Sequence, residues 1–224
     1  MNLEGRFVAL EPLIDGHAPD LHATLCGPGD TSLWTYRPVG PPPSVADLVE
    51  LNRGWPWADG NVSWAVLPTA AGASGTVPAR TASGMTTLTR IEPTHGQVEV
   101  AGVIYSAALQ RSPATTEATY LLMRYAFDDL GYRRFEWKCD SLNEPSRRAA
   151  TRLGFRFEGT FRHHMVTRSR SRDTDWFSVT DTEWRTLRPV HEQWLAPDNF
   201  ADDGRQRLAL GALTAAWRAG PADP

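Results

Sequence analysis

Residues 97–130 read QVEVAGVIYSAALQRSPATTEATYLLMRYAFDDL, and this stretch decides the fold class. Its first nine residues, Gln97 to Tyr105, are rich in valine and predict a strand. Apolar residues from Ala118 to Leu130 then recur at helical spacing and predict a helix over Thr115 to Leu130, which Gly131 would end. A strand, a loop and a long helix in this order predict a mixed α/β domain.

The segments before this stretch predict further strands and helices. Ser44 is a good N-cap residue, and apolar residues at helical spacing after it predict a helix that ends at Arg53. The Gly- and Pro-rich residues 27–43 and the Ala-, Gly- and Ser-rich residues 70–83 predict loops. We expect one more helix at His17 to Leu25. Three strands are expected at Phe7 to Leu10, Trp64 to Leu67 and Met85 to Ile91.

The segments after this stretch continue the alternation of strands and helices. Phe135, Trp137 and Cys139 alternate with charged residues, which is the period of a strand. A short helix from Asn143 to Leu153 and a hairpin follow, the hairpin strands covering Phe155 to Met165 and Thr174 to Thr180. From Asp181 onward we expect a short helix, a proline-containing link and an amphipathic helix near Arg205 to Arg218.

The composition excludes several classes of protein. A length of 224 residues suits one large domain, and 41% hydrophobic and 22% charged residues are ordinary for a globular protein. The net charge of -3 argues against a general nucleic-acid binder, and no apolar run approaches the ~18 residues that span a bilayer. No signal peptide precedes Cys26 or Cys139, so we expect reduced thiols in a cytoplasmic protein.

Four ordered segments closely resemble the GNAT superfamily of acyltransferases. They are residues 98–105 (VEVAGVIY), 110–118 (QRSPATTEA), 143–148 (NEPSRR) and 153–159 (LGFRFEG), and the similarity covers nearly the whole chain. Within the superfamily they resemble the bacterial ribosomal-protein N-terminal acetyltransferases. The resemblance implies the GNAT fold, an α/β (α+β) domain with a mixed, mostly antiparallel sheet of about seven strands and flanking helices. Residues 1–188 would form this acyltransferase domain, with residues 189–224 as a helical extension packed on it.

The resemblance also implies an N-acetyltransferase that uses acetyl-CoA. A loop that ends at a helix N-terminus binds anions because it offers free backbone N–H groups and the positive end of the helix dipole. The coenzyme A diphosphate would lie over this backbone, in contact with Gln110, Arg111, Ser112, Ala114, Thr115 and Thr116. The family has glycine where this chain has Pro113 and Thr115, which predicts a looser approach to phosphate and one fewer N–H group. Read without the resemblance, the same residues form an ordinary helix start.

Two further groups of residues acquire roles from the resemblance. Asn143 is suited to cap the short helix, and Ser146 lies in its first turn. In the family these positions contact the cofactor arm and its sulfur, so Ser146 is a candidate acid for the leaving thiolate. Backbone N–H groups near Ile104 and Tyr105 would meet the oxyanion of the tetrahedral intermediate. A capping pair without chemistry is the alternative for Asn143 and Ser146.

Glu99 is the candidate general base. Only a neutral amine attacks a thioester, and an alkylammonium group has a pKa near ~10.4, so a base is required. Glu99 lies on the strand that leads to the anion loop, and the branch that the chain resembles carries glutamate there. A structurally paired strand carboxylate is the alternative interpretation.

Other polar residues carry weaker signals. His163 and His164 are adjacent, so on a strand they face opposite sides and cannot share a metal, and no metal is expected. Cys139 shares its strand face with aromatic residues, which favours packing over nucleophilic use. Arginines 168, 170 and 172 lie in the predicted hairpin turn, and tryptophans 34, 55 and 57 with Tyr36 could line the acceptor wall or simply pack.

Two competing functions remain open. The departures at Pro113 and Thr115 allow a GNAT-fold enzyme with a degenerate coenzyme A loop, which uses another donor or catalyses another reaction. The second competing function is a non-catalytic ligand-binding module that uses the nine tryptophans. The expected partners are an amine-bearing small molecule or a protein N-terminus, with no nucleic acid and no membrane, and a homodimer is a further expectation.

Overall fold

The protein has a mixed α/β architecture in which eight strands form one sheet. The computed structural model describes residues 1–27, 31–54, 60–73 and 77–220. The strand order is β1-β2-β3-β4-β5-β6-β8-β7, and the pairings of β1 with β2, β2 with β3, β3 with β4, β6 with β8 and β7 with β8 are antiparallel. This confirms the predicted fold class, with one strand more than expected.

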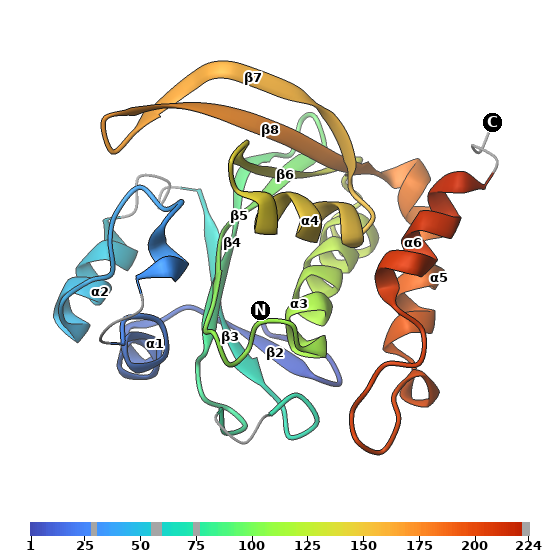
Figure 1. Ribbon diagram of the computed structural model, residues 1–224, viewed down its shortest axis with the longest axis horizontal. Coiled ribbons are helices and arrows are strands. Elements are labelled where there is room, and N and C mark those ends of the chain that lie inside the picture. Colours follow the sequence, from blue (N-terminus) through green and yellow to red (C-terminus); the bar gives the residue numbers. More distant parts are fainter. Residues whose placement is uncertain (28–30, 55–59, 74–76, 221–224) are drawn as a thin grey trace. The chain divides into compact units, whose positions relative to one another are not determined.

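The strands lie close to their predicted positions (Figure 1). Their bounds are β1 Leu3–Glu4, β2 Val8–Pro12, β3 Val62–Pro68, β4 Gly84–Glu92, β5 Gln97–Tyr105, β6 Arg134–Asp140, β7 Arg156–Thr167 and β8 Arg170–Thr180. The bounds of β5 match the prediction at both ends, because the turn at Gly96 and the loop from Ser106 interrupt the pattern sharply. The two-residue strand β1 was not predicted, since two residues are too few to show a period.

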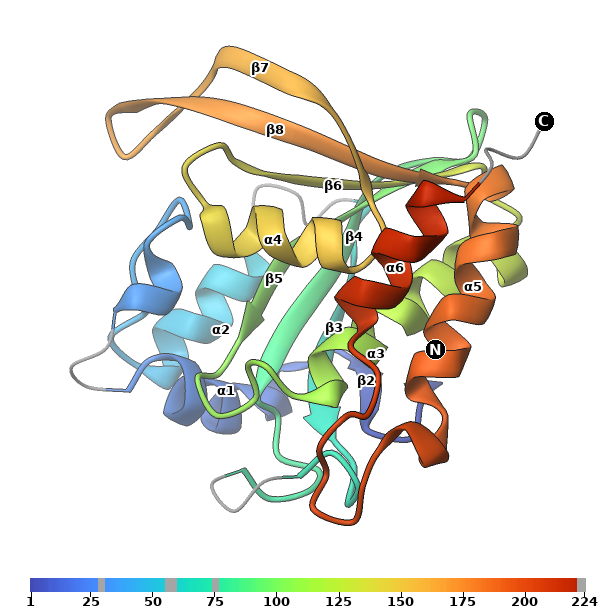
Figure 2. The same ribbon diagram turned by 45° about the vertical axis from the view of Figure 1, so that its right-hand side comes forward.

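Six α-helices accompany the sheet in the described part of the chain (Figure 2). They are α1 Ala18–Leu25, α2 Val45–Arg53, α3 Pro113–Arg124, α4 Glu144–Arg152, α5 Asp181–Leu195 and α6 Leu210–Ala219. The long helix predicted from Thr115 begins two residues earlier, at Pro113, and its last turns form a π-helix over Tyr125–Asp129. Short 3-10 turns occupy Asp15–His17, Ser32–Trp34 and Pro197–Asn199.

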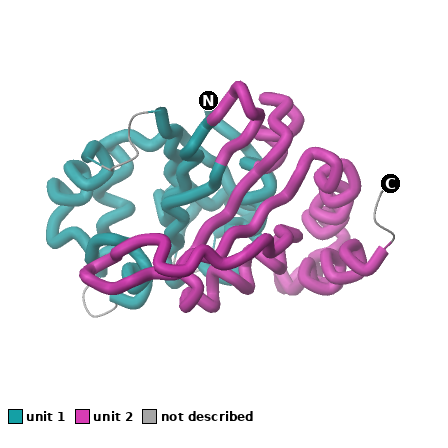
Figure 3. The backbone as a smooth tube through the Cα atoms, turned by 90° about the horizontal axis from the view of Figure 1, so that it is seen from above, with its two compact units in different colours: residues 1–91, 99–122 teal, residues 92–98, 123–224 magenta. Residues whose placement is uncertain are grey.

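The chain divides into two compact units (Figure 3). Unit 1 comprises residues 1–91 and 99–122, and unit 2 comprises residues 92–98 and 123–224. The core of unit 1 includes Leu21 and Leu25 of α1, Leu48 of α2 and Trp34, all at most 1% exposed. Ser44 caps α2 as predicted, because its side chain accepts a hydrogen bond from the Asp47 amide.

Unit 2 combines the long β7–β8 hairpin with β6 and three helices. α5 runs for 15 residues and contains Pro189, so the first helix after β8 is longer than expected. A proline at this position removes one backbone donor, but the buried side chains of Trp184, Leu187 and Trp194 hold the helix in place. α6 lies beside α5 in both ribbon views, and the Trp217 indole N–H donates to Thr186 Oγ1 at 2.9 Å (Figures 1 and 2).

Neither a membrane span nor a metal cluster is found among the described residues. No helix in them has both the length and the apolar character needed to cross a bilayer. They also contain no group of three or more His, Cys, Asp and Glu side chains arranged to hold a metal ion.

Candidate functional site

The predicted site residues fall into two groups, one in each compact unit. Unit 1 holds Glu99 and the β5–α3 segment, with the predicted contacts Ile104, Tyr105, Gln110, Arg111, Ser112, Ala114, Thr115 and Thr116. Unit 2 holds Asn143 and Ser146 at the start of α4. The structure therefore brings the residues of each group together, and each group is described in its own surroundings.

The end of β5 is held tightly against the start of β4. The Ser106 amide donates to the carbonyl oxygen of Ser83 at 2.8 Å. A Cβ atom at Gly84 would lie 2.7 Å from the carbonyl oxygen of Ile104, so only glycine allows this approach. Ile104 is buried at 4% exposure, and Tyr105 is half-buried. The predicted oxyanion segment is thus a rigid strand end.

β5 is distorted at Gly102, and an arginine from the segment between α1 and α2 binds it there. Gly102 has a φ of 63°, in the left-handed region that favours glycine. The Arg37 guanidinium donates to the Gly102 carbonyl oxygen at 3.1 Å and lies over the Trp34 ring. Burial lowers the pKa of Arg37 to about 10. Sequence reasoning missed Arg37, because it lies in a Gly- and Pro-rich loop without periodicity.

The loop between β5 and α3 is a series of tight turns. The amides of Leu109 and Gln110 both donate to the Ser106 carbonyl, at 3.0 Å each. Arg111 is exposed and has a φ of 60°, a conformation that non-glycine residues rarely adopt. The Ser112 hydroxyl donates to the Leu109 carbonyl at 2.6 Å. The loop is therefore stabilised by its own hydrogen bonds before any ligand is considered.

The start of α3 is the predicted anion-binding segment. Pro113 is the first helical residue, a position where the missing N–H group would have had no intrahelical partner anyway. The Thr115 hydroxyl donates to the Ser112 carbonyl at 3.0 Å, so its proton is used within the loop. The hydroxyl protons of Ser112 and Thr115 thus point at carbonyl groups. Ala114 is 0% and Thr116 2% exposed, so among the first-turn amides, which lack an intrahelical acceptor, we assign the contact with a ligand to that of the partly exposed Thr115. This arrangement fits an anion.

Glu99 is a buried carboxylate with an arginine beside it. The residue is 6% exposed and lies in β5. Arg90 Nε of β4 lies 3.7 Å from Glu99 Oε2, and the Arg90 side chain is 55% exposed. Arg90 is thus a cation that the structure places beside the buried Glu99 carboxyl group. Sequence reasoning allowed both a base and a paired strand carboxylate; the structure places Arg90 beside the carboxylate, and the role of general base stays a prediction.

Asn143 and Ser146 form a capping pair at the start of α4. Asn143 Oδ1 accepts a hydrogen bond from the Ser146 amide at 3.2 Å, as predicted. The Ser146 hydroxyl oxygen accepts a hydrogen bond from Trp137 Nε1 of β6 at 3.0 Å. Ser146 also forms a hydrogen bond with the Cys139 thiol. Ser146 is therefore held in one place by two neighbours on the adjoining strand.

Cys139 is a packed thiol. It is 5% exposed, and burial raises its pKa to about 11, which the hydrogen bond with Ser146 opposes. Such a thiol is almost entirely protonated near neutral pH and is a poor nucleophile. The expectation of a packing role agrees with this environment.

The remaining residues singled out by the sequence are dispersed. His163 lies at an irregularity of β7 and has a φ of 52°, while the His164 ring bonds Thr174 Oγ1 at 3.0 Å. Trp34 is a core residue whose indole N–H donates to the Leu25 carbonyl at 2.8 Å, so its role is packing. Tyr36 is 36% exposed, and Trp55 and Trp57 lie outside the described residues.

Glu117 is a further buried carboxylate, which positions α3. Its side chain accepts hydrogen bonds from the amides of Arg6, Phe7 and Val8 at 2.9, 2.6 and 3.0 Å. Burial raises the pKa of Glu117, and these three amides oppose the rise. The sequence analysis assigned no role to Glu117, because a contact across 110 residues leaves no local pattern.

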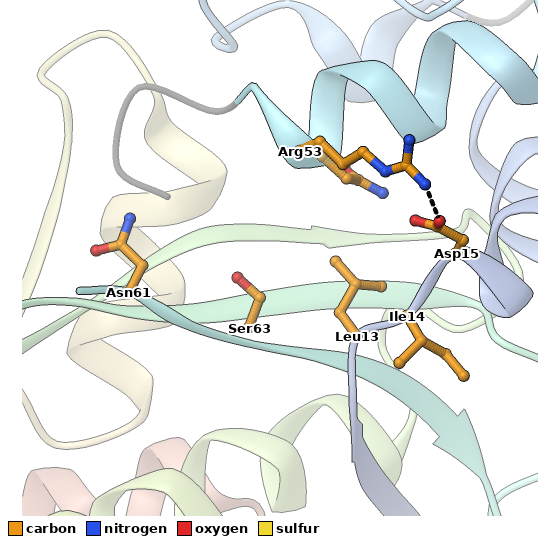
Figure 4. Close-up of a pocket in the computed structure, with 7 residues that line it drawn as sticks. Leu13, Ile14, Asp15, Arg53, Asn61 and Ser63 are labelled. Carbon is orange, nitrogen blue, oxygen red and sulfur yellow. Dashed lines mark hydrogen bonds and ion pairs between the residues drawn. The ribbon is translucent and has the colours of Figure 1, made fainter. Parts of the chain in front are cut away.

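A cavity of about 250 Å³ lies elsewhere in unit 1 (Figure 4). It is lined by Leu13, Ile14, Asp15, Asn52, Arg53, Asn61 and Ser63, none of which was predicted to act in the site. Arg53 and Asp15 form an ion pair at its edge. The cavity is large enough for a small polar molecule only.

The comparisons with known proteins agree with this geometry. Residues 8–156 match the family described as "Acetyltransferase (GNAT) domain". A solved GCN5-related N-acetyltransferase from Brucella melitensis is 39% identical, with a TM-score of 0.86 over 96% of this chain and 94% of that one. A probable GNAT-family acetyltransferase from Chromobacterium violaceum is 35% identical, with a TM-score of 0.71 over 82% and 88%.

A more distant structure, spermidine N-acetyltransferase from Vibrio cholerae in complex with CoA and spermine, has the same fold. It is 16% identical, with a TM-score of 0.61 over 80% of this chain and 98% of that one. No curated protein matched the chain. The family match covers more than half of the chain and the Brucella structure nearly all of it. The chain therefore belongs to the GNAT acetyltransferase family.

Proposed function

We propose that this protein transfers an acetyl or related acyl group directly from acyl-coenzyme A to a primary amine. The observation that carries the proposal is the start of α3, where Ser112 and Thr115 donate their hydroxyl protons to loop carbonyls. The partly exposed Thr115 lies in the first turn of α3, so its amide is at the positive end of the helix dipole, which is where a diphosphate binds. Bound coenzyme A would supply the thioester that carries the acyl group.

Pro113 is compatible with this proposal. The family has glycine here, and proline removes one N–H donor, but Pro113 occupies the first position of α3 and has a φ suited to it. The exposed side chain of Arg111 in the preceding turn can add a charge-assisted hydrogen bond to phosphate. We therefore assign the anion contacts to the backbone from Gln110 to Thr116 and expect weaker binding than a glycine-rich loop would give.

Glu99 is the proposed general base. It accepts a proton from the ammonium form of the acceptor, directly or through a water molecule, so that the neutral amine attacks. Its burial keeps the carboxylate away from bulk solvent, and Arg90 holds its orientation. The amides near Ile104 and Tyr105 lie on the rigid end of β5 and would stabilise the oxyanion.

Ser146 is the proposed donor to the departing sulfur. Trp137 fixes its oxygen, so the hydroxyl proton can turn between the Cys139 thiol and a second acceptor. Glu99 and Ser146 belong to different compact units, and the role of each is argued from its own contacts. Serine is a weak acid, so stabilisation of the thiolate by a hydrogen bond is sufficient for this role.

The acceptor is proposed as an amine on a small molecule or at a protein N-terminus. The resemblance to ribosomal-protein N-terminal acetyltransferases favours a protein N-terminus, whose ammonium group has a pKa near ~7.7 and so needs less help from a base. A panel of amines with a free-thiol readout identifies the acceptor.

A second candidate function follows from the loop sequence. Pro113 and Thr115 replace the family glycines, so a GNAT-fold enzyme that uses another donor would retain the same fold. This candidate predicts that acetyl-CoA does not bind, which calorimetric titration of the purified protein tests directly.

Glu99→Gln tests the mechanism. We expect a fall in kcat of about a hundredfold or more, with an unchanged Kd for acetyl-CoA, because only proton transfer is removed. Glu92→Gln, at the exposed end of β4, is the matched control and keeps full activity. Full turnover by the Glu99 variant would remove the base assignment, and failure of the unaltered protein to bind acetyl-CoA would remove the donor.

A further inference from the structure

Unit 2 contains a second cavity, which the proposed acyl transfer does not use. Its volume is about 650 Å³, within the range of about 300–1,000 Å³ that is usual for small-molecule sites. It lies between α4, α6 and the β7–β8 hairpin, and the residues that characterise its lining are Arg147, Arg148, Arg152, Arg218, Phe157 and Phe177. The residues proposed above for base, acid and diphosphate binding are absent from its lining.

The apolar part of the cavity is a pair of phenylalanine rings. Phe157 of β7 lies opposite Phe177 of β8 in the antiparallel ladder, so both side chains point to the same face of the sheet. Their ring centroids are 5.4 Å apart in an edge-to-face arrangement. Phe177 is 3% exposed, whereas Phe157 is 53% exposed. The cavity therefore leaves one aromatic ring open to a flat apolar group.

The polar part of the cavity carries an excess of positive charge. Four arginines line it together with one carboxylate, Glu144. Glu144 pairs with both Arg147 and Arg148, at 3.2 and 3.3 Å, so it is shared between two guanidinium groups. Arg147 has a second partner, because its Nε lies 2.7 Å from Asp175 Oδ2 of β8. The four guanidinium groups of the lining thus face two carboxylates, those of Glu144 and Asp175.

Arg218 is held at the cavity by a neutral partner. Its Nη1 donates to the carbonyl oxygen of Thr151 at 2.9 Å, which fixes the side chain without compensating its charge. Burial lowers the pKa of Arg218, and the neighbouring charge of Arg156 lowers it further. A cation that is both partly buried and close to another cation is stabilised by an incoming anion.

We propose that this cavity binds an organic anion that carries a flat aromatic ring, of the class of aryl phosphates. The ring would pack on Phe157, and the phosphate would receive paired hydrogen bonds from the guanidinium groups at the rim. Both features contribute, because a free phosphate gains nothing from the apolar rings and a neutral ring forms no charge-assisted hydrogen bond with the arginines. Its lining shares no residue with the proposed coenzyme A contacts at the start of α3.

Calorimetric titration of the full chain with 1-naphthyl phosphate tests the proposal. We expect one-to-one binding, at least about tenfold tighter than that of inorganic phosphate or of 1-naphthol, which each satisfy half of the site. Arg148→Gln and Phe157→Ser change exposed residues of the lining, so both variants fold, and each weakens binding by about fivefold or more. Arg185→Gln alters an exposed arginine of α5 outside the cavity and leaves the affinity unchanged.

Saturation with acetyl-CoA separates the two anion sites. We expect 1-naphthyl phosphate to bind equally well with and without acetyl-CoA. Equal affinity of the unaltered protein and the Arg148 and Phe157 variants overturns the proposal. Loss of binding in the presence of acetyl-CoA also overturns it, because the probe would then occupy the cosubstrate site.

Discussion

The helices α3 and α4 both begin with a proline in the first turn, yet their N-termini are prepared in opposite ways. At α4 the Asn143 side chain accepts a hydrogen bond from the Ser146 amide, so the helix satisfies its own donor. At α3 the hydroxyl groups of Ser112 and Thr115 donate to carbonyls. One helix start is closed by a side-chain acceptor, while the other directs its side-chain protons at carbonyls and presents the partly exposed Thr115 as its open position.

The two helices also differ in how they are anchored. α3 is held by a carboxylate, Glu117, which accepts from the three amides of residues 6–8. α4 is held at its other end by His191 of α5, whose Nε2 atom lies 2.9 Å from the carbonyl oxygen of Leu153. The Glu117 carboxylate accepts hydrogen bonds from three amides, whereas the His191 imidazole donates one hydrogen bond. An open N-terminus thus accompanies a charged anchor, and a closed one accompanies a neutral anchor.

Loss of the α3 anchor is the strongest way to break this comparison. We expect Glu117→Ala to lower the free energy of unfolding by about 4 kcal/mol, because three buried amides lose a charged acceptor. Glu117→Gln keeps one acceptor oxygen and loses less. Urea unfolding measures both variants. Glu144 is an exposed residue in the first turn of α4, so Glu144→Ala is the control and should lower the free energy of unfolding by about 0.5 kcal/mol or less. If Glu117→Ala lowers the free energy of unfolding as little as the control does, the contact of Glu117 with the amides of residues 6–8 contributes nothing to stability.

The α4 anchor makes stability depend on pH. Burial lowers the pKa of His191 from 6.5 to about 4, and the Leu153 hydrogen bond opposes this change. The unfolded chain therefore binds a proton between these pH values and the folded chain does not. The resulting stability is complete above pH 6.5 and is lost as the pH falls toward 4, by about 3 kcal/mol in all.

Substitution of the histidine isolates this contribution. His191→Gln keeps a side-chain donor for the Leu153 carbonyl but cannot titrate. Urea unfolding measured from about pH 7 to about pH 4 should show that the free energy of unfolding declines by about 3 kcal/mol less in the variant than in the unaltered protein. Parallel declines would assign the pH dependence to carboxylates elsewhere.

The sequence predicted the elements on which these helices depend, but not their anchors. The strand from Gln97 to Tyr105 and the cap at Asn143 were predicted because each depends on residues within a few positions of it. The partners of Glu117 and His191 lie 110 and 38 residues away, and no period or spacing reports them. The same holds for Arg37, whose contact with Gly102 spans 65 residues.

Helix ends in the C-terminal region were harder to predict for a different reason. A proline inside a helical pattern predicts a break, but α5 continues through Pro189. The buried face of Trp184, Leu187 and Trp194 offsets the lost hydrogen bond, and burial of this kind is a tertiary property. Local propensity therefore located α5 without giving its length.

The open amides of α3 can be tested without disturbing the fold. A carboxylate in the first turn stabilises a helix but repels a diphosphate, so Thr115→Asp separates binding from stability. We expect the Kd for acetyl-CoA to rise by about tenfold or more while the free energy of unfolding is kept. Calorimetric titration and urea unfolding measure the two quantities. An unchanged Kd would place the diphosphate elsewhere.

The closed start of α4 gives the smallest effect. Asn143→Ala removes the acceptor for the Ser146 amide and should cost about 1 kcal/mol, whereas Asn143→Asp keeps the acceptor and adds a charge that suits a helix N-terminus. If the cap also positions the Ser146 hydroxyl, the alanine variant loses kcat beyond this loss of stability, and the aspartate variant does not. Equal kcat in both variants would leave α4 a structural helix, and the chemistry would then depend on the open end of α3.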